Sequence, residues 1–243
     1  NTTASDNTAV GRSALGANTT GTKNTALGRT ALFENTTGGN NVAVGNAALR
    51  ENTTGEKNVA VGAFTLDAST TASFNTAIGY EALGVNTSGI SNVAVGLDSL
   101  KSNTTANYNT AVGTNALKAN TTGHLNTAVG MNALDANTTG LYNTAVGYAA
   151  ITDKTTGNAN VGVGYEAGEK MTTGENNTML GYKAGFNVTT GSNNICIGKE
   201  ALLPNAVDNN QIVLGNSSNS HLRCQVQTIS GLSDRRDKTA IED

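Results

Sequence analysis

The residue types that most often perform chemistry in proteins are scarce and scattered in this chain. Its 243 residues include two histidines and two cysteines, and only 14% of them are charged. Cys196 and Cys224 lack the close spacing of a zinc site or a disulfide framework. His124 and His221 have no second ligand nearby in the sequence. Since no phosphate-binding loop, nucleophile elbow or carboxylate pair is present either, we predict no metal and no cofactor.

Four tyrosines are the best candidates for contact with a ligand. Tyr80, Tyr148, Tyr165 and Tyr182 occupy one position of a repeat that runs through the chain. Exposed aromatic rings can stack on sugars, so one hypothesis is that they bind a cell-surface glycan. The alternative, which we favour, is that the rings brace the outside of the repeats or a seam between subunits.

An internal repeat of 17 residues sets the position of these tyrosines. From Gly11 to Gly215, every seventeenth residue is glycine, which gives 13 units without an insertion or deletion. Each glycine follows an aliphatic residue, a mostly Ala position and a Thr, Val or Ile, as in Thr8–Val10. This alternation, ended by glycine, predicts one short strand per unit. A Leu recurs four residues past the glycine, and Asn-Thr-Thr-Gly then predicts a turn.

Units of this length must stack to bury an apolar face. We therefore predict an all-β parallel β-solenoid of 13 coils over residues 1–221, with a C-terminal tail at 222–243. The period is strict because one extra residue would move side chains to the opposite face. An Asn precedes 12 of the 13 strands and predicts a hydrogen-bonded amide ladder. Its members are Asn7, Asn24, Asn41, Asn58, Asn75, Asn92, Asn109, Asn126, Asn143, Asn160, Asn177 and Asn194.

The distribution of charge along the repeat predicts which columns face solvent. Of the 25 charged side chains in residues 1–210, 23 occupy six of the 17 columns, and Lys154 and Asp208 are the exceptions. All ten aromatic residues occur in the same six columns, which we interpret as exposed corners. The Thr/Val, Ala, Val and Leu columns are interpreted as the interior. Because neither strand face is charged, we expect both to be covered, the Ala face by another copy in three-fold packing.

Sequons of the form Asn-x-Thr/Ser recur at the repeat period, at Asn18, Asn35, Asn52, Asn86, Asn103, Asn120 and Asn137 among others. They are a pattern for N-glycosylation. Since they arrive with the repeat, we interpret them as asparagines that the turn requires.

The strings Asn-Thr-Ala-Val-Gly and Asn-Val-Ala-Val-Gly resemble the head repeat of trimeric autotransporter adhesins. This resemblance implies a homotrimer of left-handed parallel β-rolls. Between residues 160 and 215 the units shift to Asn-Asn-Thr-Met-Leu-Gly-Tyr-Lys-Ala-Gly and Gly-Ser-Asn-Asn-Ile-Cys-Ile-Gly. This variant resembles the shaft segments that precede the C-terminal chaperone of phage tail fibres.

The tail contains Ser-Asp-Arg-Arg-Asp-Lys and then an Ile, which resembles the start of the endosialidase-type intramolecular chaperone. That family cuts its own chain with a Ser–Lys dyad, which corresponds to Ser233 and Lys238 and to the Leu232–Ser233 bond. In such a dyad a neutral amine takes the hydroxyl proton before the serine attacks a carbonyl. Asp237 departs from the family pattern and favours the charged form of Lys238. We expect self-cleavage only where the rest of the chaperone domain is present.

These features predict a structural fibre protein and not an enzyme. The first hypothesis is a rigid trimeric shaft of a phage tail fibre that extends or displays a host-binding region. The alternative is the head of a bacterial surface trimeric adhesin that binds host or matrix ligands. The expected partners are further copies of the chain and a host cell-surface glycan or protein. A net charge of −3 excludes a basic surface for nucleic acid, and no apolar run approaches the roughly 20 residues of a membrane span.

Overall fold

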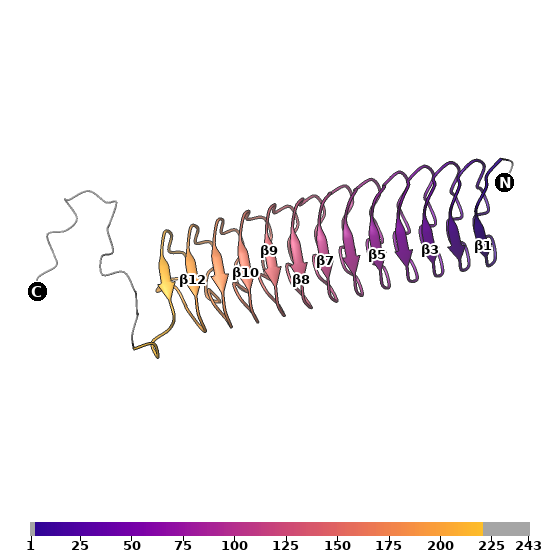
Figure 1. Ribbon diagram of the computed structural model, residues 1–243. Helices are drawn as coiled ribbons and strands as arrows, with labels where there is room; N and C mark the ends of the chain where they lie inside the picture. Colours follow the sequence, from indigo (N-terminus) through magenta and orange to yellow (C-terminus); the bar gives the residue numbers. More distant parts are fainter. Residues whose placement is uncertain (1–2, 221–243) are drawn as a thin grey trace, which may run out of the picture.

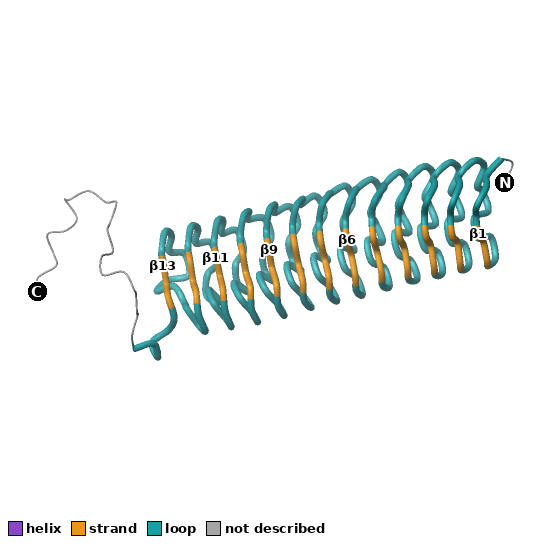
Figure 2. Tube along the Cα trace, in the orientation of Figure 1, coloured by secondary structure: helices purple, strands orange, loops and turns teal. Residues whose placement is uncertain are grey.

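The computed structural model describes residues 3–220, which form a straight stack of coils (Figure 1). Thirteen strands lie in one parallel sheet, each hydrogen-bonded to the next in chain order. Turns make up the rest of each coil, and the described residues contain no helix (Figure 2). The predicted parallel β-solenoid with a 17-residue period is confirmed. Its strands are β1 (Thr8–Val10), β2 (Thr25–Leu27), β3 (Val42–Val44), β4 (Val59–Val61), β5 (Thr76–Ile78), β6 (Val93–Val95), β7 (Thr110–Val112), β8 (Thr127–Val129), β9 (Thr144–Val146), β10 (Val161–Val163), β11 (Thr178–Leu180), β12 (Ile195–Ile197) and β13 (Ile212–Leu214).

The register between neighbouring coils is constant. Thr8 lies opposite Thr25 and Ala9 opposite Ala26, and the offset stays at 17 residues along the sheet. At the start of the strand the Thr8 amide donates to the Asn24 carbonyl of the next coil (2.9 Å). At the end of the next strand the Gly28 amide donates to the Val10 carbonyl of the coil before (2.8 Å). Each coil is therefore bonded to its neighbours at both ends of its strand.

The interior is narrower than the sequence predicts. Only the middle residue of each strand points inward, and Ala43 and its equivalents from Ala26 to Ala145 are buried. Leu residues such as Leu49 come from the opposite wall and complete the core. The strand residues on either side of the Ala point outward, as Val10 (57% exposed) and Leu27 (47% exposed) do. The prediction that the Ala face contacts another copy is wrong, because alternate side chains of a strand lie on opposite faces and the Ala side closes on the Leu wall.

Two features of the backbone require glycine at the end of each strand. Gly45 has φ of +138°, a conformation that a Cβ atom disfavours. A Cβ atom at this position would also lie only 2.3 Å from the Gly62 carbonyl oxygen of the next coil. The turn after each strand thus brings two backbones closer together than any side chain allows.

The turn that follows contains non-glycine residues in the left-handed conformation. Ala47 and Leu49 have φ of 55° and 53°, and equivalent residues recur along the stack. A bulky residue rarely adopts this conformation, and no residue type in these columns predicts it. The backbone reversal at Leu49 directs its side chain into the core, where it is fully buried.

The residue types in the core change towards the C-terminus, but the volume of the core remains filled. In the coil of β11, Met179 replaces the inner Ala, and Gly168 and Gly185 occupy the two flanking Leu positions. A Cβ atom at Gly185 would lie 2.1 Å from the Met179 sulfur, so the methionine occupies the space that a Leu fills elsewhere. Likewise a Cβ atom at Gly162 would lie 2.5 Å from Cγ1 of Ile151. Larger and smaller residues compensate each other across neighbouring coils.

Candidate functional site

The most extensive candidate for an interaction is the outer strand face, formed by the first and third residues of β1–β13. Its 26 positions hold only Thr, Val, Ile and Leu. Ile78 (40%), Val129 (36%) and Leu180 (46%) are among the exposed members. Of the 26 side chains, 12 are exposed and the other 14 are half-buried. An uncharged face of this extent that water reaches is the usual mark of an interaction site. The sequence indicated that the strand is covered on both sides, but it assigned the wrong residues to the external side.

Three of the four predicted ligand-binding tyrosines form a stack on an exposed edge. The rings of Tyr148 and Tyr165 lie 5.1 Å apart at 13°, and those of Tyr165 and Tyr182 lie 5.3 Å apart at 11°. Both faces of the Tyr165 ring are therefore covered by its neighbours. Tyr80 lies apart from this stack and contacts the Phe64 ring edge-on at 5.9 Å. The four tyrosines do not form one site, and a sugar could reach only the ring edges and the ends of the stack.

Charged residues surround the tyrosine stack. Lys183 forms an ion pair with Glu166 at 3.0 Å, and its amine also lies over the Phe186 ring at 5.0 Å from the centroid. A hydrogen bond to Tyr165 is the largest cause that lowers the pKa of Glu166, and the same bond raises the pKa of the Tyr165 hydroxyl. These contacts hold the aromatic rings in one orientation along the corner.

The asparagines before the strands are hydrogen-bonded from coil to coil. Asn24 donates its backbone amide to Oδ1 of Asn7 at 2.9 Å, and its side-chain amide donates to the Gly38 carbonyl, also at 2.9 Å. The same arrangement continues to Gln211, whose amide donates to Asn194. Each asparagine from Asn24 to Asn194 is buried and links its own coil to both neighbours. The links run mainly from backbone amide to side-chain oxygen, in addition to some contacts between the amide side chains themselves.

A second asparagine ladder lies in the column that contains the sequons. Here Asn35 donates its side-chain amide to Oδ1 of Asn18 at 2.8 Å and to the Gly38 carbonyl at 3.0 Å. These asparagines are buried, so their side chains are directed inward and away from solvent. The sequence pattern predicts turn residues at these positions and does not predict the ladder. The recurrence of Asn, where Ser or Thr would also make a turn, is the signal that could have revealed it.

Lys154 interrupts this second ladder. Its side chain is completely buried, and its Nζ has no hydrogen-bond partner within residues 3–220. Oδ1 of Asn137, in the coil before, is also left without a partner in that range. Burial lowers the pKa of Lys154 from 10.5 to about 8, and the charge of Glu175 opposes this shift. Lys154 is thus a charged residue enclosed in the core, and Glu175 is the group whose charge favours its protonated form.

Several sequence-predicted residues lie outside the described part of the chain. These are Ser233 and Lys238 of the predicted dyad, the Leu232–Ser233 bond, Cys224 and His221. Cys196 occupies the inner column of β12, where it is buried and where burial raises its thiol pKa to about 11. Across residues 3–220, no three His, Cys, Asp or Glu side chains gather in a way that could hold a metal ion. The same residues include no helix with the length and apolarity needed to cross a membrane.

The fold defines the class of this protein as a β-solenoid repeat protein. No protein-family model, curated protein or solved structure matches the chain. Its function must therefore be argued from its own surfaces.

Proposed function

We propose that the chain is the shaft of a trimeric fibre, a phage tail fibre that extends or displays a host-binding region. The observation that carries this proposal is the outer strand face, which runs along the whole stack without a charged residue. Water would face about two dozen aliphatic and Thr side chains in a single chain. Packing three copies around an axis would remove this face from water.

A fibre function agrees with the geometry of the stack. Thirteen coils at the strand spacing of about 4.8 Å give a rod of about 60 Å. The stack is straight (Figure 1), and hydrogen bonds from coil to coil run through the strands and both asparagine ladders. Such a rod resists bending and suits a spacer. The proposal includes a left-handed solenoid, meaning the direction in which the coils wind, and a location in a virion. Both come from the resemblance of the repeats to fibre and adhesin segments.

The mass of the full chain in solution tests the trimer. We expect light scattering to give three times the chain mass of 24.6 kDa. The double variant Ile78→Glu/Val129→Glu places charges on the outer strand face and should reduce the mass to that of one chain. Thr105→Glu, an exposed position outside that face, is the matched control and should stay trimeric. A single-chain mass for the unmodified protein, or a trimer that tolerates the double variant, would refute the proposal.

A second candidate function is the head of a bacterial surface adhesin, and the exposed tyrosine stack favours it. Tyr148, Tyr165 and Tyr182 present hydroxyls and ring edges in a row that a host glycan or matrix protein could contact. Binding to host cells should then fall at least about tenfold in Tyr165→Ala, the loss of one aromatic contact in a binding site. Tyr80→Ala, outside the stack, should bind normally. Equal binding by both variants would remove the support for this candidate.

A further inference from the structure

The tyrosine stack brings the phenol rings of consecutive coils into contact. Tyr148, Tyr165 and Tyr182 each come directly after the glycine that follows β9, β10 or β11. The ring centroids of neighbours lie 5.1 and 5.3 Å apart, and the rings are inclined by only 13° and 11°. Because the rings leave equivalent positions in nearly the same orientation, the carbons beside one hydroxyl lie next to those of the following ring. The three residues are 41%, 43% and 45% exposed, so a reagent in water can reach them.

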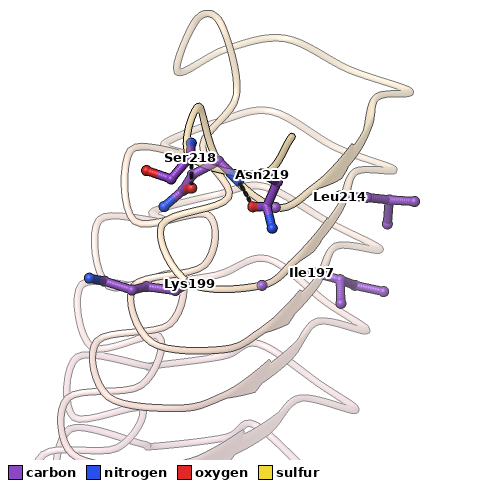
Figure 3. A pocket seen from close by; sticks show the side chains of 8 residues that line it. Ile197, Lys199, Leu214, Ser218 and Asn219 are labelled. Atoms are coloured by element: carbon purple, nitrogen blue, oxygen red, sulfur yellow. Dashed lines mark hydrogen bonds between the residues drawn. The ribbon is translucent and has the colours of Figure 1, made fainter. Parts of the chain in front are cut away.

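The corner that carries the stack lies away from the outer strand face. In the coil after Tyr182, the same column contains Lys199. Figure 3 shows the side chains of Lys199 and Ile197 pointing to opposite sides of this coil. Ile197 belongs to β12 and to the outer strand face. A copy of the chain packed on that face would therefore leave the tyrosine corner in contact with solvent.

A carboxylate is placed to take the proton of the middle tyrosine. Glu166 accepts a hydrogen bond from the Tyr165 hydroxyl, and this bond is the largest cause that lowers the pKa of Glu166. Lys183 pairs with the same carboxylate at 3.0 Å and favours its ionised form. A phenol that loses an electron also loses its hydroxyl proton. An ionised acceptor in hydrogen-bond contact therefore favours the oxidation of this ring.

Tyr80 provides a comparison within the same chain. It occupies the same column, is 48% exposed and also hydrogen-bonds to the glutamate that follows it, Glu81. Its ring partner is Phe64, which has no hydroxyl, and the next coil has Leu97 in this column. Among residues 3–220, tyrosine rings contact each other only in the stack. The stack thus differs from Tyr80 in having a second phenol in contact.

We propose that the tyrosine stack is a site of oxidative modification, at which a dityrosine bond joins Tyr165 to Tyr148 or Tyr182. The co-reactant is a one-electron oxidant driven by hydrogen peroxide, of the peroxidase type. Each tyrosine gives up one electron and its hydroxyl proton, and the two radicals form a C–C bond between ring carbons beside the oxygens. The hydrogens of those two carbons then move to the oxygens and restore both phenols. One peroxide takes up the two electrons and two protons and becomes two waters.

The product is a covalent link between two coils along the exposed corner. It adds to the hydrogen bonds that already join these coils through the strands. This inference does not depend on the trimer or on the fibre function.

Treatment of the full chain with hydrogen peroxide and a peroxidase tests the site. We expect a single-chain product that has lost two hydrogens and shows dityrosine fluorescence, with peptide mapping that joins two members of the stack. Tyr165→Phe keeps the stacked ring but leaves the outer two phenols two coils apart, about 10 Å, and should lower the intrachain product at least about tenfold. Tyr80→Phe removes a tyrosine from the same column and is the matched control, which should keep the full yield.

A second variant should move the site along the column. Leu97→Tyr places a phenol one coil after Tyr80. In the Tyr165→Phe background we expect it to restore the intrachain product, now mapped to positions 80 and 97. A lack of restoration would overturn the proposal, because contact in this column would then not suffice. It would also be overturned by an undiminished yield in Tyr165→Phe, by dityrosine found only between chains, or by no product from the unmodified chain.

Discussion

Replacement of the buried Lys154 by Met should stabilise the protein by an amount that depends on pH. Lys154 is fully buried, and its Nζ has no partner within residues 3–220. The next two coils place Met171 and Val188 in the same column, so an apolar side chain of similar length suits this part of the core. Lys154→Met keeps the volume and removes the charge.

The magnitude follows from the pKa of the lysine. Burial lowers this pKa from 10.5 to about 8. A shift of this size corresponds to about 3 kcal/mol, at 1.36 kcal/mol for each pKa unit. Because the folded protein binds the proton less tightly than the unfolded chain, the charged amine destabilises the fold fully below pH 8. This penalty decreases as the pH rises from about 8 through 10.5 and is lost only above 10.5, where the amine is neutral in both the folded and the unfolded states.

Urea unfolding of both proteins at several pH values measures this effect. At pH 7 we expect Lys154→Met to raise the free energy of unfolding by about 3 kcal/mol, the full cost of the shifted pKa. The advantage should shrink steadily above pH 8. Lys23→Met removes an equal charge from an exposed position and should show no such gain. A pH-independent difference, or no stabilisation at pH 7, would refute the claim that a buried charge destabilises this coil.

Three further substitutions test the packing of the coils by urea unfolding. Gly45→Ala should lower the free energy of unfolding by about 1–3 kcal/mol, because Gly45 has φ of +138° and an added Cβ atom would meet the Gly62 carbonyl. The control Gly39→Ala should cost less, since a Cβ atom there would lie 3.2 Å from its nearest neighbour. Equal losses of stability in the two variants would contradict this explanation. Asn103→Ala should cost about 1–3 kcal/mol, because it removes the bonds to Asn86 Oδ1 (2.9 Å) and the Ala106 carbonyl (3.1 Å); a neutral result would show that the second ladder contributes no stability. Met179→Ala should lower the free energy of unfolding by about 2–5 kcal/mol, because it leaves a cavity. Gly185→Leu alone should also destabilise, since its side chain clashes with Met179, but the double variant should recover most of the stability. Losses that simply add in the double variant would argue against compensation.

The main features of the fold could be predicted from the sequence because the same residue pattern recurs in 13 units. The period, the parallel stacking and the position of the strands follow from the glycine and aliphatic columns. The direction in which each strand faces could not be derived in the same way. Both faces of a strand such as Thr110–Val112 are uncharged, so the pattern does not distinguish the interior Ala111 from the exterior Val112. The decisive fact is the left-handed turn at Leu117, which brings that side chain across the coil to the Ala side.

The candidate sites were predictable to a different degree. The exposed position of Tyr148, Tyr165 and Tyr182 follows from their column, which also contains charged residues elsewhere. That their rings stack on each other depends on three consecutive coils holding the same residue and on the small distance between coils, which the sequence alone does not supply. The second asparagine ladder was hidden because Asn-Thr-Thr-Gly is equally typical of an exposed turn.

The left-handed residues in each coil have a consequence for the kinetics of folding. Ala47 and Leu49 hold a backbone conformation that costs on the order of 1 kcal/mol or more for each residue. An isolated coil recovers little of this cost, because most of its backbone hydrogen bonds and its apolar contacts are made with adjacent coils. Folding should therefore begin slowly, with the first few coils forming together, and then continue rapidly by addition of single coils to an existing end. In this respect the chain folds in the manner of a one-dimensional crystal, in which nucleation determines the rate and growth follows a template.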